Sequence, residues 1–372
     1  RSIRYGLMRS NVRSIDAILA SGERVSFGPL PTDSELVDGP EEYRRLVRSM
    51  MTLAKRESDE IIRCFPKIHR RVGGYNIDAL LQQQPSGPPL NMAELLVGSE
   101  GTLAFSARIS LQLQRTPSHK VVGVCHFSTF YQAMDVTQHI VKLNPDAVEL
   151  VDRTLIELAK DIAIFRDTLD SFIRGTPDAV LLVEFAGEDM ELLRNQLNQL
   201  VALMGDLGFP DSVVEITDPF MQRAVWELRK AGLNIMMSMK GDGKPVSFIE
   251  DCAVPLDNLA EFTHRLTDVF HRHGTTGTWY AHASVGCLHV RPVLNLKSEI
   301  DVKKMRDIAE EAFAMVREYK GSHSGEHGDG LVRSEFHQPM FGNRMTRAFE
   351  DVKDSFDPEG LLNPGKIVRP SK

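Results

Sequence analysis

Residues 280–291 read YAHASVGCLHVR, and whether this stretch forms a helix or two strands decides the fold class. In a helix, His282 and His289 would share a face but lie roughly 10.5 Å apart along the axis, too far for one metal ion. The β-branched and aromatic content instead favours two strands with a turn at 284–286, which would bring the two imidazoles together. His289 and Arg291 then point the same way on the second strand. The sequence therefore predicts an antiparallel hairpin at 278–293 that carries ligand-type side chains.

A second cluster of ionisable residues lies at 321–330, GSHSGEHGDG, where the glycines allow an irregular backbone and close approach to a ligand. Glu326 places a hard oxygen ligand beside the acid–base group of His327. With His282 and His289, Glu326 would complete a two-histidine, one-carboxylate set, which suits Zn²⁺, Mn²⁺ or Fe²⁺ and leaves positions open for substrate. The alternatives are a flexible surface loop here and ordinary polar residues of a sheet surface in the hairpin.

The composition is that of a globular protein, with 372 residues, 42% hydrophobic and 26% charged. The net charge of −7 without an obviously basic face argues against nucleic acid as the main ligand. The sequence has no apolar run of about 18 residues, which argues against a membrane span. The scattered cysteines form no CxxC pair, which fits a reducing, cytoplasmic location and argues against a thiolate metal site in this chain. The chain begins at Arg1, within what reads as a polar strand, so we expect a piece of a longer protein.

Along the chain, the pattern predicts a hairpin at 12–27, a helix that begins at Pro40, and a loop at 84–89. Residues 107–114 alternate strictly between apolar and polar, which predicts a half-buried strand. After a boundary near 116–119, strands and helices alternate, which favours an α+β layer domain. Its expected strands are 121–127, 180–185 and 248–254, and its expected helices are 130–143, 188–207, 256–271 and 302–319.

Three further features are weak when taken singly. The turn at 98–102 offers backbone N–H groups to a phosphate or a ribose, although a plain turn is the simpler interpretation. The segment 363–366 near the C-terminus carries no decisive chemistry alone. Arg229 has a plain alternative as a solvated charge on a helix.

Taken together, these motifs resemble the FAD-linked oxidases with the vanillyl-alcohol-oxidase (PCMH) type of flavin domain, in the branch of D-lactate dehydrogenase, glycolate oxidase and D-2-hydroxyglutarate dehydrogenase. The matching segments are residues 94–103, 282–289, 325–328 and 356–366. They occur in family order across nearly the whole chain, which is far more specific than any one motif.

The resemblance implies an α+β fold with a partial PCMH-type FAD-binding domain at 1–117. A cap domain with an antiparallel sheet covered by helices would follow at 118–330, and residues 331–372 would return to the flavin domain. By analogy, His282, His289 and Glu326 correspond to ligands of a divalent metal, Zn²⁺ or Mn²⁺, and His327 to the catalytic base. Arg229 corresponds to a substrate-binding arginine. The FAD contacts correspond to Gly98, Ser99, Glu100, Gly101, Thr102 and Asn363.

This sequence departs from the family pattern in two ways. The upstream glycine-rich loop that wraps the FAD pyrophosphate is not in this chain, so we expect the chain alone to bind FAD weakly or not at all and to be inactive, whereas the full protein should bind it. Near Arg229, Leu233 and Ile249 occupy positions where polar substrate ligands are expected. Lys240, Lys244 or Arg291 would then take over the distal carboxylate of the substrate.

The resemblance implies oxidation of a D-2-hydroxy acid, such as D-2-hydroxyglutarate or D-lactate, to the 2-oxo acid. Expected partners are the hydroxy acid and an electron acceptor, which is a quinone, an electron-transfer protein or an attached iron–sulfur region. A homodimer and attachment to the inner face of the membrane are compatible with it. Two other classes remain open at this point: a metal-dependent hydrolase or lyase without flavin, and a non-catalytic cap or interaction fragment.

Overall fold

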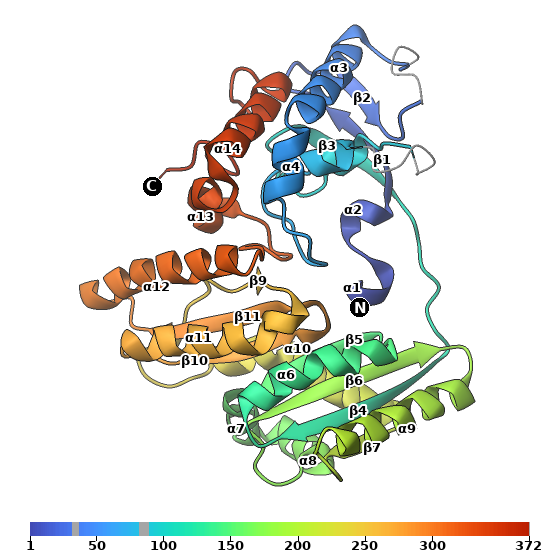
Figure 1. Cartoon of the computed structure of the whole chain (residues 1–372), viewed down its shortest axis with the longest axis vertical. Coiled ribbons are helices and arrows are strands. Elements are labelled where there is room, and N and C mark those ends of the chain that lie inside the picture. Colours follow the sequence, from blue (N-terminus) through green and yellow to red (C-terminus); the bar gives the residue numbers. More distant parts are fainter. Residues whose placement is uncertain (32–36, 82–88, 372) are drawn as a thin grey trace. The chain divides into compact units, whose positions relative to one another are not determined.

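The structure is a computed structural model that describes residues 1–31, 37–81 and 89–371. It divides into two compact units (Figure 1). The large-sheet unit comprises Arg1–Tyr5 and Arg115–Gly321, and the small-sheet unit comprises Gly6–Gln114 and Ser322–Lys372. Most of the loop expected at 84–89 lies outside the described residues.

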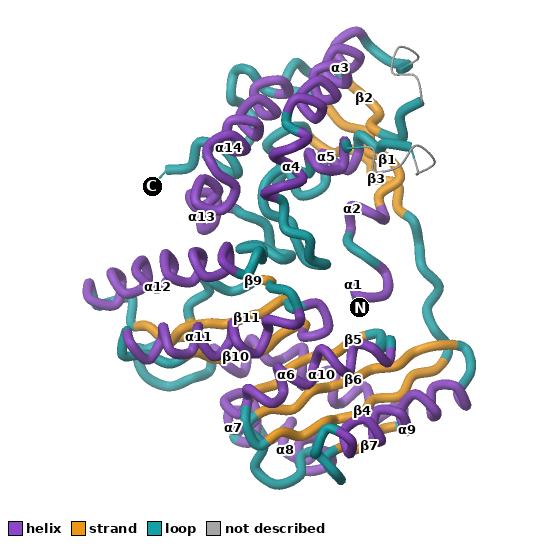
Figure 2. The backbone as a smooth tube through the Cα atoms, viewed as in Figure 1, coloured by secondary structure: helices purple, strands orange, loops and turns teal. Residues whose placement is uncertain are grey.

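The large-sheet unit is built on an antiparallel sheet of strand order β7-β4-β6-β5-β10-β11-β8, with β9 alongside β11 (Figure 2). Its strands bury apolar side chains on both faces, so they read as nearly continuous apolar runs. The strands are β4 His119–Phe127, β5 Ala147–Asp152, β6 Ala179–Gly187, β7 Val213–Ile216, β8 Lys244–Pro245, β9 Cys252–Ala253, β10 Gly277–His282 and β11 Cys287–Leu294.

Helices cover both faces of this sheet. Alternate residues of β4 and β6 form one core with α7, α8 and α10. On the opposite face, α9 approaches so closely that a Cβ at Gly123 would meet Leu200 at 2.5 Å. Helices α6 and α11 pack side by side, and α12 packs against α11 (Figure 1). The helices of this unit are α1 Ser2–Tyr5, α6 Phe130–Ile140, α7 Arg153–Lys160, α8 Ala163–Phe172, α9 Met190–Asp206, α10 Pro219–Met237, α11 Leu259–Arg272 and α12 Glu299–Glu318.

The small-sheet unit joins segments that are far apart in the sequence. Its sheet has the order β2-β1-β3. An aromatic core links the two ends of the chain, because Phe27 of β2 packs against Phe356 of α14 with ring centroids 6.0 Å apart. The elements of this unit are β1 Val12–Ile18, β2 Arg24–Phe27, β3 Phe105–Leu111, α2 Met8–Asn11, α3 Glu41–Arg56, α4 Ser58–Cys64, α5 Ala93–Leu96, α13 Gly330–Arg333 and α14 His337–Phe356.

The α+β class and the antiparallel, helix-covered sheet are confirmed, as are the hairpins at 12–27 and 278–293. The helix that follows Pro40 and those at 130–143, 188–207, 256–271 and 302–319 are present with shifted ends. The compact units divide the chain at 114/115 and 321/322, so the loop that carries Glu326 and His327 belongs to the small-sheet unit.

Three local predictions are wrong. Residues 2–5 are helical rather than a polar strand. The strand at 107–114 exists as β3 but is exposed along its whole length, because alternation fixes which side chains share a face and not whether anything covers that face. The strand at 248–254 shrinks to Cys252–Ala253, because Asp251 has a φ of +80° that breaks the extended run.

No helix in the described ranges is long and apolar enough to cross a membrane.

Candidate active site

The β10–β11 hairpin places the two predicted histidines beside each other in the large-sheet unit. His282 pairs with Cys287 and Tyr280 pairs with His289 in the ladder. The imidazole centroids of His282 and His289 lie 4.9 Å apart at an interplanar angle of 89°. The turn needs Gly286, because its φ is +66° and a Cβ there would lie 2.1 Å from the carbonyl oxygen of Val254. The prediction that the turn brings the two rings together is confirmed.

Glu149 of β5 connects two predicted site residues that are 53 positions apart in the sequence. Its carboxylate oxygens lie 2.8 and 2.9 Å from Nδ1 of His282, and it accepts a 2.7 Å hydrogen bond from Nη2 of Arg229. Burial alone would raise the pKa of Glu149, but the hydrogen bond from His282 and the nearby charges of His282 and Arg229 hold that pKa below its usual value. Glu149 is therefore an ionised, buried acceptor.

Arg229 of α10 is buried, with 9% of its surface exposed, so its interpretation as a solvated helical charge is wrong. Its guanidinium lies over the ring of Tyr280 at 4.8 Å, a cation–π contact. Its Nε atom is buried and has no hydrogen-bond partner among the described residues. A buried guanidinium N–H without an acceptor fits a site that takes an anionic ligand.

The other predicted substrate residues of this unit make internal contacts. Arg291 of β11 is buried, and its Nε bonds the carboxylate of Glu250. Lys244 of β8 donates to the carbonyl of Met239.

His289 stacks on Tyr280, with ring centroids 4.7 Å apart and an interplanar angle of 25°. The ring of Tyr280 thus contacts both Arg229 and His289.

The predicted carboxylate ligand and the predicted base lie on a loop of the small-sheet unit. Glu326 forms a 2.9 Å ion pair with Nη1 of Arg70, and Nε2 of His327 lies 3.9 Å from the other carboxylate oxygen of Glu326. Their side chains are 20% and 37% exposed, respectively. The amide of Val72 donates to the carbonyl of Ser324 at 3.0 Å. The loop is therefore held at Ser324 by a backbone hydrogen bond, while Glu326 and His327 lie at its partly exposed tip.

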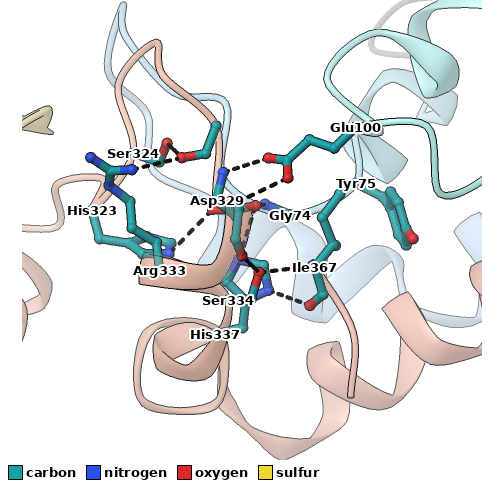
Figure 3. Close-up of polar contacts among 12 residues, drawn as sticks. Gly74, Tyr75, Glu100, His323, Ser324, Asp329, Arg333, Ser334, His337 and Ile367 are labelled. Carbon is teal, nitrogen blue, oxygen red and sulfur yellow. Dashed lines mark hydrogen bonds and ion pairs between the residues drawn. The ribbon is translucent and has the colours of Figure 1, made fainter. Parts of the chain in front are cut away.

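Glu100, which belongs to the predicted flavin-contact turn, bonds the backbone of this loop at Asp329 (Figure 3). Its carboxylate accepts hydrogen bonds from the amides of Asp329 and Gly330, at 2.5 and 2.9 Å. Its backbone carbonyl accepts from Nδ2 of Asn363 at 2.7 Å. Gly328 has a φ of +87°, and a Cβ there would lie 2.5 Å from Oε1 of Glu100. The structure thus brings together the turn at 98–102, the loop at 325–330 and Asn363.

Within the turn at 98–102, two predicted FAD-binding side chains serve the turn itself. Ser99 Oγ donates to the carbonyl of Leu96 at 2.8 Å, and Thr102 Oγ1 donates to the carbonyl of Ser99 at 2.6 Å. Gly98, Glu100 and Gly101 have φ values of 77°, 55° and 69°, in the left-handed region. The backbone of these three residues is therefore the part of the turn that suits contact with a ligand.

Sequence reasoning missed Glu149 and Lys353. Glu149 is a lone acid inside the apolar run of a buried strand, a pattern that itself signals a paired charge. Lys353 of α14 is 3% exposed and donates to the carbonyls of Thr102 and Leu362, both at 2.7 Å, and to Asp357. The i,i+4 spacing of Lys353 and Asp357 is visible in the sequence, but their burial is not.

A model of the family described as FAD linked oxidases, C-terminal domain, matches residues 116–367, more than half of the chain. The protein therefore belongs to the FAD-linked oxidases.

Among curated proteins, the chain is 28% identical over 386 aligned residues to D-2-hydroxyglutarate dehydrogenase from Pantoea ananatis, and equally identical to that from Escherichia coli K12 over 380. Each match covers 99% of this chain and 37% of the relative. The mitochondrial D-lactate dehydrogenase [cytochrome] of Arabidopsis thaliana is 22% identical, with 99% of this chain and 54% of that protein covered. The chain thus spans little more than a third of the D-2-hydroxyglutarate dehydrogenases it matches.

Solved structures show the same fold. p-Cresol methylhydroxylase with bound substrate matches with a TM-score of 0.60 at 12% identity, over 96% of this chain and 65% of that one. 4-Ethylphenol oxidase from Gulosibacter chungangensis matches with a TM-score of 0.59 at 13% identity, over 98% of this chain and 66% of that one. At such identities the likeness concerns the fold alone, which is the PCMH type predicted from the sequence.

Proposed function

We propose that the protein containing this chain is a flavin-dependent dehydrogenase that oxidises a D-2-hydroxy acid, D-2-hydroxyglutarate or D-lactate, to the 2-oxo acid. Membership of the FAD-linked oxidases and the names of the curated relatives support this reaction class. The observation that carries the proposal is the Glu149 contact set, because one buried carboxylate orients both a candidate metal ligand and a candidate carboxylate-binding arginine.

The donor set of the chain fits a divalent metal, Zn²⁺ or Mn²⁺. His282 has Nδ1 against a carboxylate, which is the usual support of a histidine that binds metal through Nε2. His289 supplies a second imidazole from the same hairpin, and we infer that Glu326 supplies the carboxylate. Such a metal, when bound, polarises the hydroxyl group of the substrate and lowers the free energy of removing its proton.

The chain's own residues bind the substrate and move its proton. Arg229 presents a buried N–H that has no acceptor within the described part of the chain, which suits the C1 carboxylate of a 2-hydroxy acid. Arg291 and Lys244 are the candidates for a second, distal carboxylate. An imidazole nitrogen of His327 accepts the hydroxyl proton, since the ring lies at the partly open tip of its loop.

For the flavin, we propose contacts from the backbone of Gly98, Glu100 and Gly101 and from Asn363, with Ser99 and Thr102 shaping the turn. When bound, FAD supplies the hydride acceptor. Reoxidation then needs an electron acceptor, which we propose to be a quinone, an electron-transfer protein or an attached iron–sulfur region. A homodimeric state and a cytoplasmic location, free or at the inner face of the membrane, complete the proposal.

A substrate screen on the full-length protein tests this function. Flavin bleaching is followed under anaerobic conditions with D-lactate, D-2-hydroxyglutarate and glycolate, each with and without chelator. Bleaching by a D-2-hydroxy acid, abolished by chelator and restored by Zn²⁺ or Mn²⁺, is expected. Metal-dependent hydrolysis or elimination with no flavin reduction would favour the hydrolase or lyase alternative. Absence of both bound metal and turnover would favour a scaffold.

A single variant tests the metal role. His282→Ala should lose the metal of this site and turnover, while far-UV circular dichroism and the unfolding midpoint stay close to those of the wild type. Retained turnover would contradict the metal role. His264→Gln is the matched control, because that histidine is exposed on α11 and belongs to no candidate site.

A further inference from the structure

A second histidine–carboxylate cluster lies in the interior of the small-sheet unit and has no part in the proposed reaction. His323, Asp329 and His337 are each at most 1% exposed. Ligand-type atoms of the three residues all lie within 4.8 Å of one another. The cluster joins two elements, since His323 and Asp329 flank the loop that carries Glu326 and His327, while His337 begins α14 (Figure 3).

The donor atoms of this cluster have the spacing of a metal site. Nε2 of His337 lies 3.0 Å from Oδ2 of Asp329, and Nε2 of His323 lies 3.5 Å from Oδ1. Two ligands of a tetrahedral zinc ion, each about 2.0–2.1 Å from the metal, are about 3.3 Å apart. The two distances to Asp329 bracket this value, and ligand atoms of all three residues lie within 4.8 Å of one another, so the three groups are close enough to share one ion after side-chain adjustment.

In His337 the proton lies on Nδ1, so Nε2 is the nitrogen that can bind a cation. Nδ1 of His337 lies 2.8 Å from the carbonyl oxygen of Ile367. A carbonyl only accepts hydrogen bonds, so Nδ1 carries a proton. Nε2 then faces the Asp329 carboxylate, where a bare lone pair would be repelled. A positive species between them, a proton or a metal ion, resolves this conflict.

The surroundings supply the outer support that metal ligands normally have. Oδ2 of Asp329 accepts a 2.8 Å hydrogen bond from the amide of Gly74, and the amide of Ile367 is itself held by Ser334 Oγ at 2.8 Å. Hydrogen bonds from such partners orient the first ligands of a metal. Gly73 closes the site, because a Cβ there would lie 2.8 Å from Cε1 of His323. The enclosure suits an ion and excludes a substrate.

The charges around the cluster also favour a cation. Asp329 is fully buried, and Glu100 binds the amide of Asp329 and so lies next to it. One guanidinium, that of Arg333, is bound to the carbonyl of Gly328 in the same loop. With both imidazoles neutral, these groups sum to one excess negative charge, which a buried cluster must neutralise.

We propose that His323, Asp329 and His337 bind a divalent transition metal, with Zn²⁺ as the first choice from the two-imidazole, one-carboxylate donor set. This site is separate from the proposed His282, His289 and Glu326 set. Its role is structural: it ties the loop 322–330 to the start of α14 and holds the tip that carries Glu326 and His327. An enclosed site with this role is expected to exchange its metal slowly.

Metal stoichiometry of the full-length protein tests the proposal without disturbing the cluster itself. The wild type and a His282→Ala, His289→Ala double variant are loaded with Zn²⁺, gel-filtered and analysed by mass spectrometry for metal. Two equivalents in the wild type and one in the double variant are expected. One equivalent in the wild type and none in the double variant would overturn the His323, Asp329 and His337 site while leaving the His282 and His289 site. One equivalent in both proteins would support the second site and contradict the metal of the proposed function.

Ligand assignment follows in the double-variant background. His337→Gln should reduce Zn²⁺ from one equivalent to none, whereas His264→Gln on the exposed face of α11 should leave it at one. Stripping the double variant of metal with a chelator and then loading it with Co²⁺ provides a second measurement that needs no substitution in the cluster. A visible absorption band of a low-symmetry cobalt site is expected, and only the spectrum of hydrated Co²⁺ would overturn the proposal, in favour of a protonated His337 paired with Asp329.

Discussion

Nδ1 of His282 lies 2.8 and 2.9 Å from the two carboxylate oxygens of Glu149, so a buried acid on β5 fixes one edge of an imidazole at the end of β10. The two residues are direct partners in the antiparallel ladder, which makes the contact a consequence of strand register. Nε2 of His282 is thereby left as the atom that can bind a metal. Register, rather than sequence proximity, builds this part of the site.

Replacing Glu149 should weaken metal binding without removing any proposed metal ligand. Glu149→Gln keeps the shape of the side chain but loses the charge that orients His282. Metal affinity should therefore fall by about 10- to 100-fold, which is typical when a hydrogen-bond partner of a metal ligand is lost. Competition with a fluorescent zinc chelator measures it. Glu215→Gln, on the exposed surface of β7 in the same sheet, is the control. Equal affinities in the two variants would contradict the supporting role of Glu149.

Arg229 should affect substrate binding more than the chemical step. Arg229→Lys keeps a positive charge but loses the planar fork that holds Glu149 and offers Nε to a ligand, so KM should rise by about 10- to 100-fold with a smaller change in kcat. Steady-state kinetics of the full-length protein with a D-2-hydroxy acid measures both constants. A variant with unchanged KM and a kcat that falls instead would argue against carboxylate binding by Arg229.

Asp152 should make folding stability depend on pH. Its carboxylate accepts from the amides of Leu155 and Trp279, at 2.9 and 3.0 Å, and burial raises its pKa from 3.8 to about 6. Between these two values the folded state holds a proton that the unfolded state has released. Stability therefore falls as the pH rises from about 4 to 6, by about 3 kcal/mol from this group.

Urea unfolding at pH 4.5, 5.5, 6.5 and 7.5 checks this expectation. Asp152→Asn cannot ionise, so its free energy of unfolding should lack that decline, and the difference from the wild type should grow with pH up to about 6 and then level off. A difference that stays constant over the whole range would refute the raised pKa.

Gly74 should tolerate no side chain. Its φ is +72°, and a Cβ would lie 2.5 Å from Cζ of Phe349 in the aromatic core. Gly74→Ala combines a left-handed backbone cost of about 1–2 kcal/mol with an overpacking cost of about 1–3 kcal/mol. Gly360→Ala, at a φ of +66° with nothing within 4 Å, carries the backbone cost alone. Thermal unfolding of both variants separates the two costs, and equal midpoints would show that the ring moves aside freely.

Lys353 should be needed to keep the turn at 98–102 and the C-terminal segment together. Lys353→Met removes three hydrogen bonds and leaves Asp357, which is 1% exposed, without its ion-pair partner. Loss of one partner of a buried pair costs about 3–5 kcal/mol. The double variant Lys353→Met, Asp357→Asn should recover part of that loss. If chemical unfolding finds the single and double variants equally stable, the ion pair is not what holds these segments.

The sequence predicted the elements whose signals are local. The hairpin at 278–293 follows from β-branched and aromatic residues around a glycine turn, and α3 follows from Pro40 and the acidic residues after it. The pairing of His282 and His289 was predicted for the same reason, because a tight turn places the residues that flank it side by side on adjacent strands. The strand predicted at 248–254 was wrong over most of its length, because the positive φ of the single residue Asp251 interrupts the extended backbone.

The sequence by itself determined the family, the antiparallel hairpin and the types of ligand available, since these depend on motif wording and short-range backbone preferences. Only the tertiary structure decided that Glu149 is the common partner of His282 and Arg229, that Glu100 caps the loop at Asp329, and that β3 stays exposed. These pairings join residues that are 80, 133 and 229 positions apart in the sequence, so no local pattern encodes them.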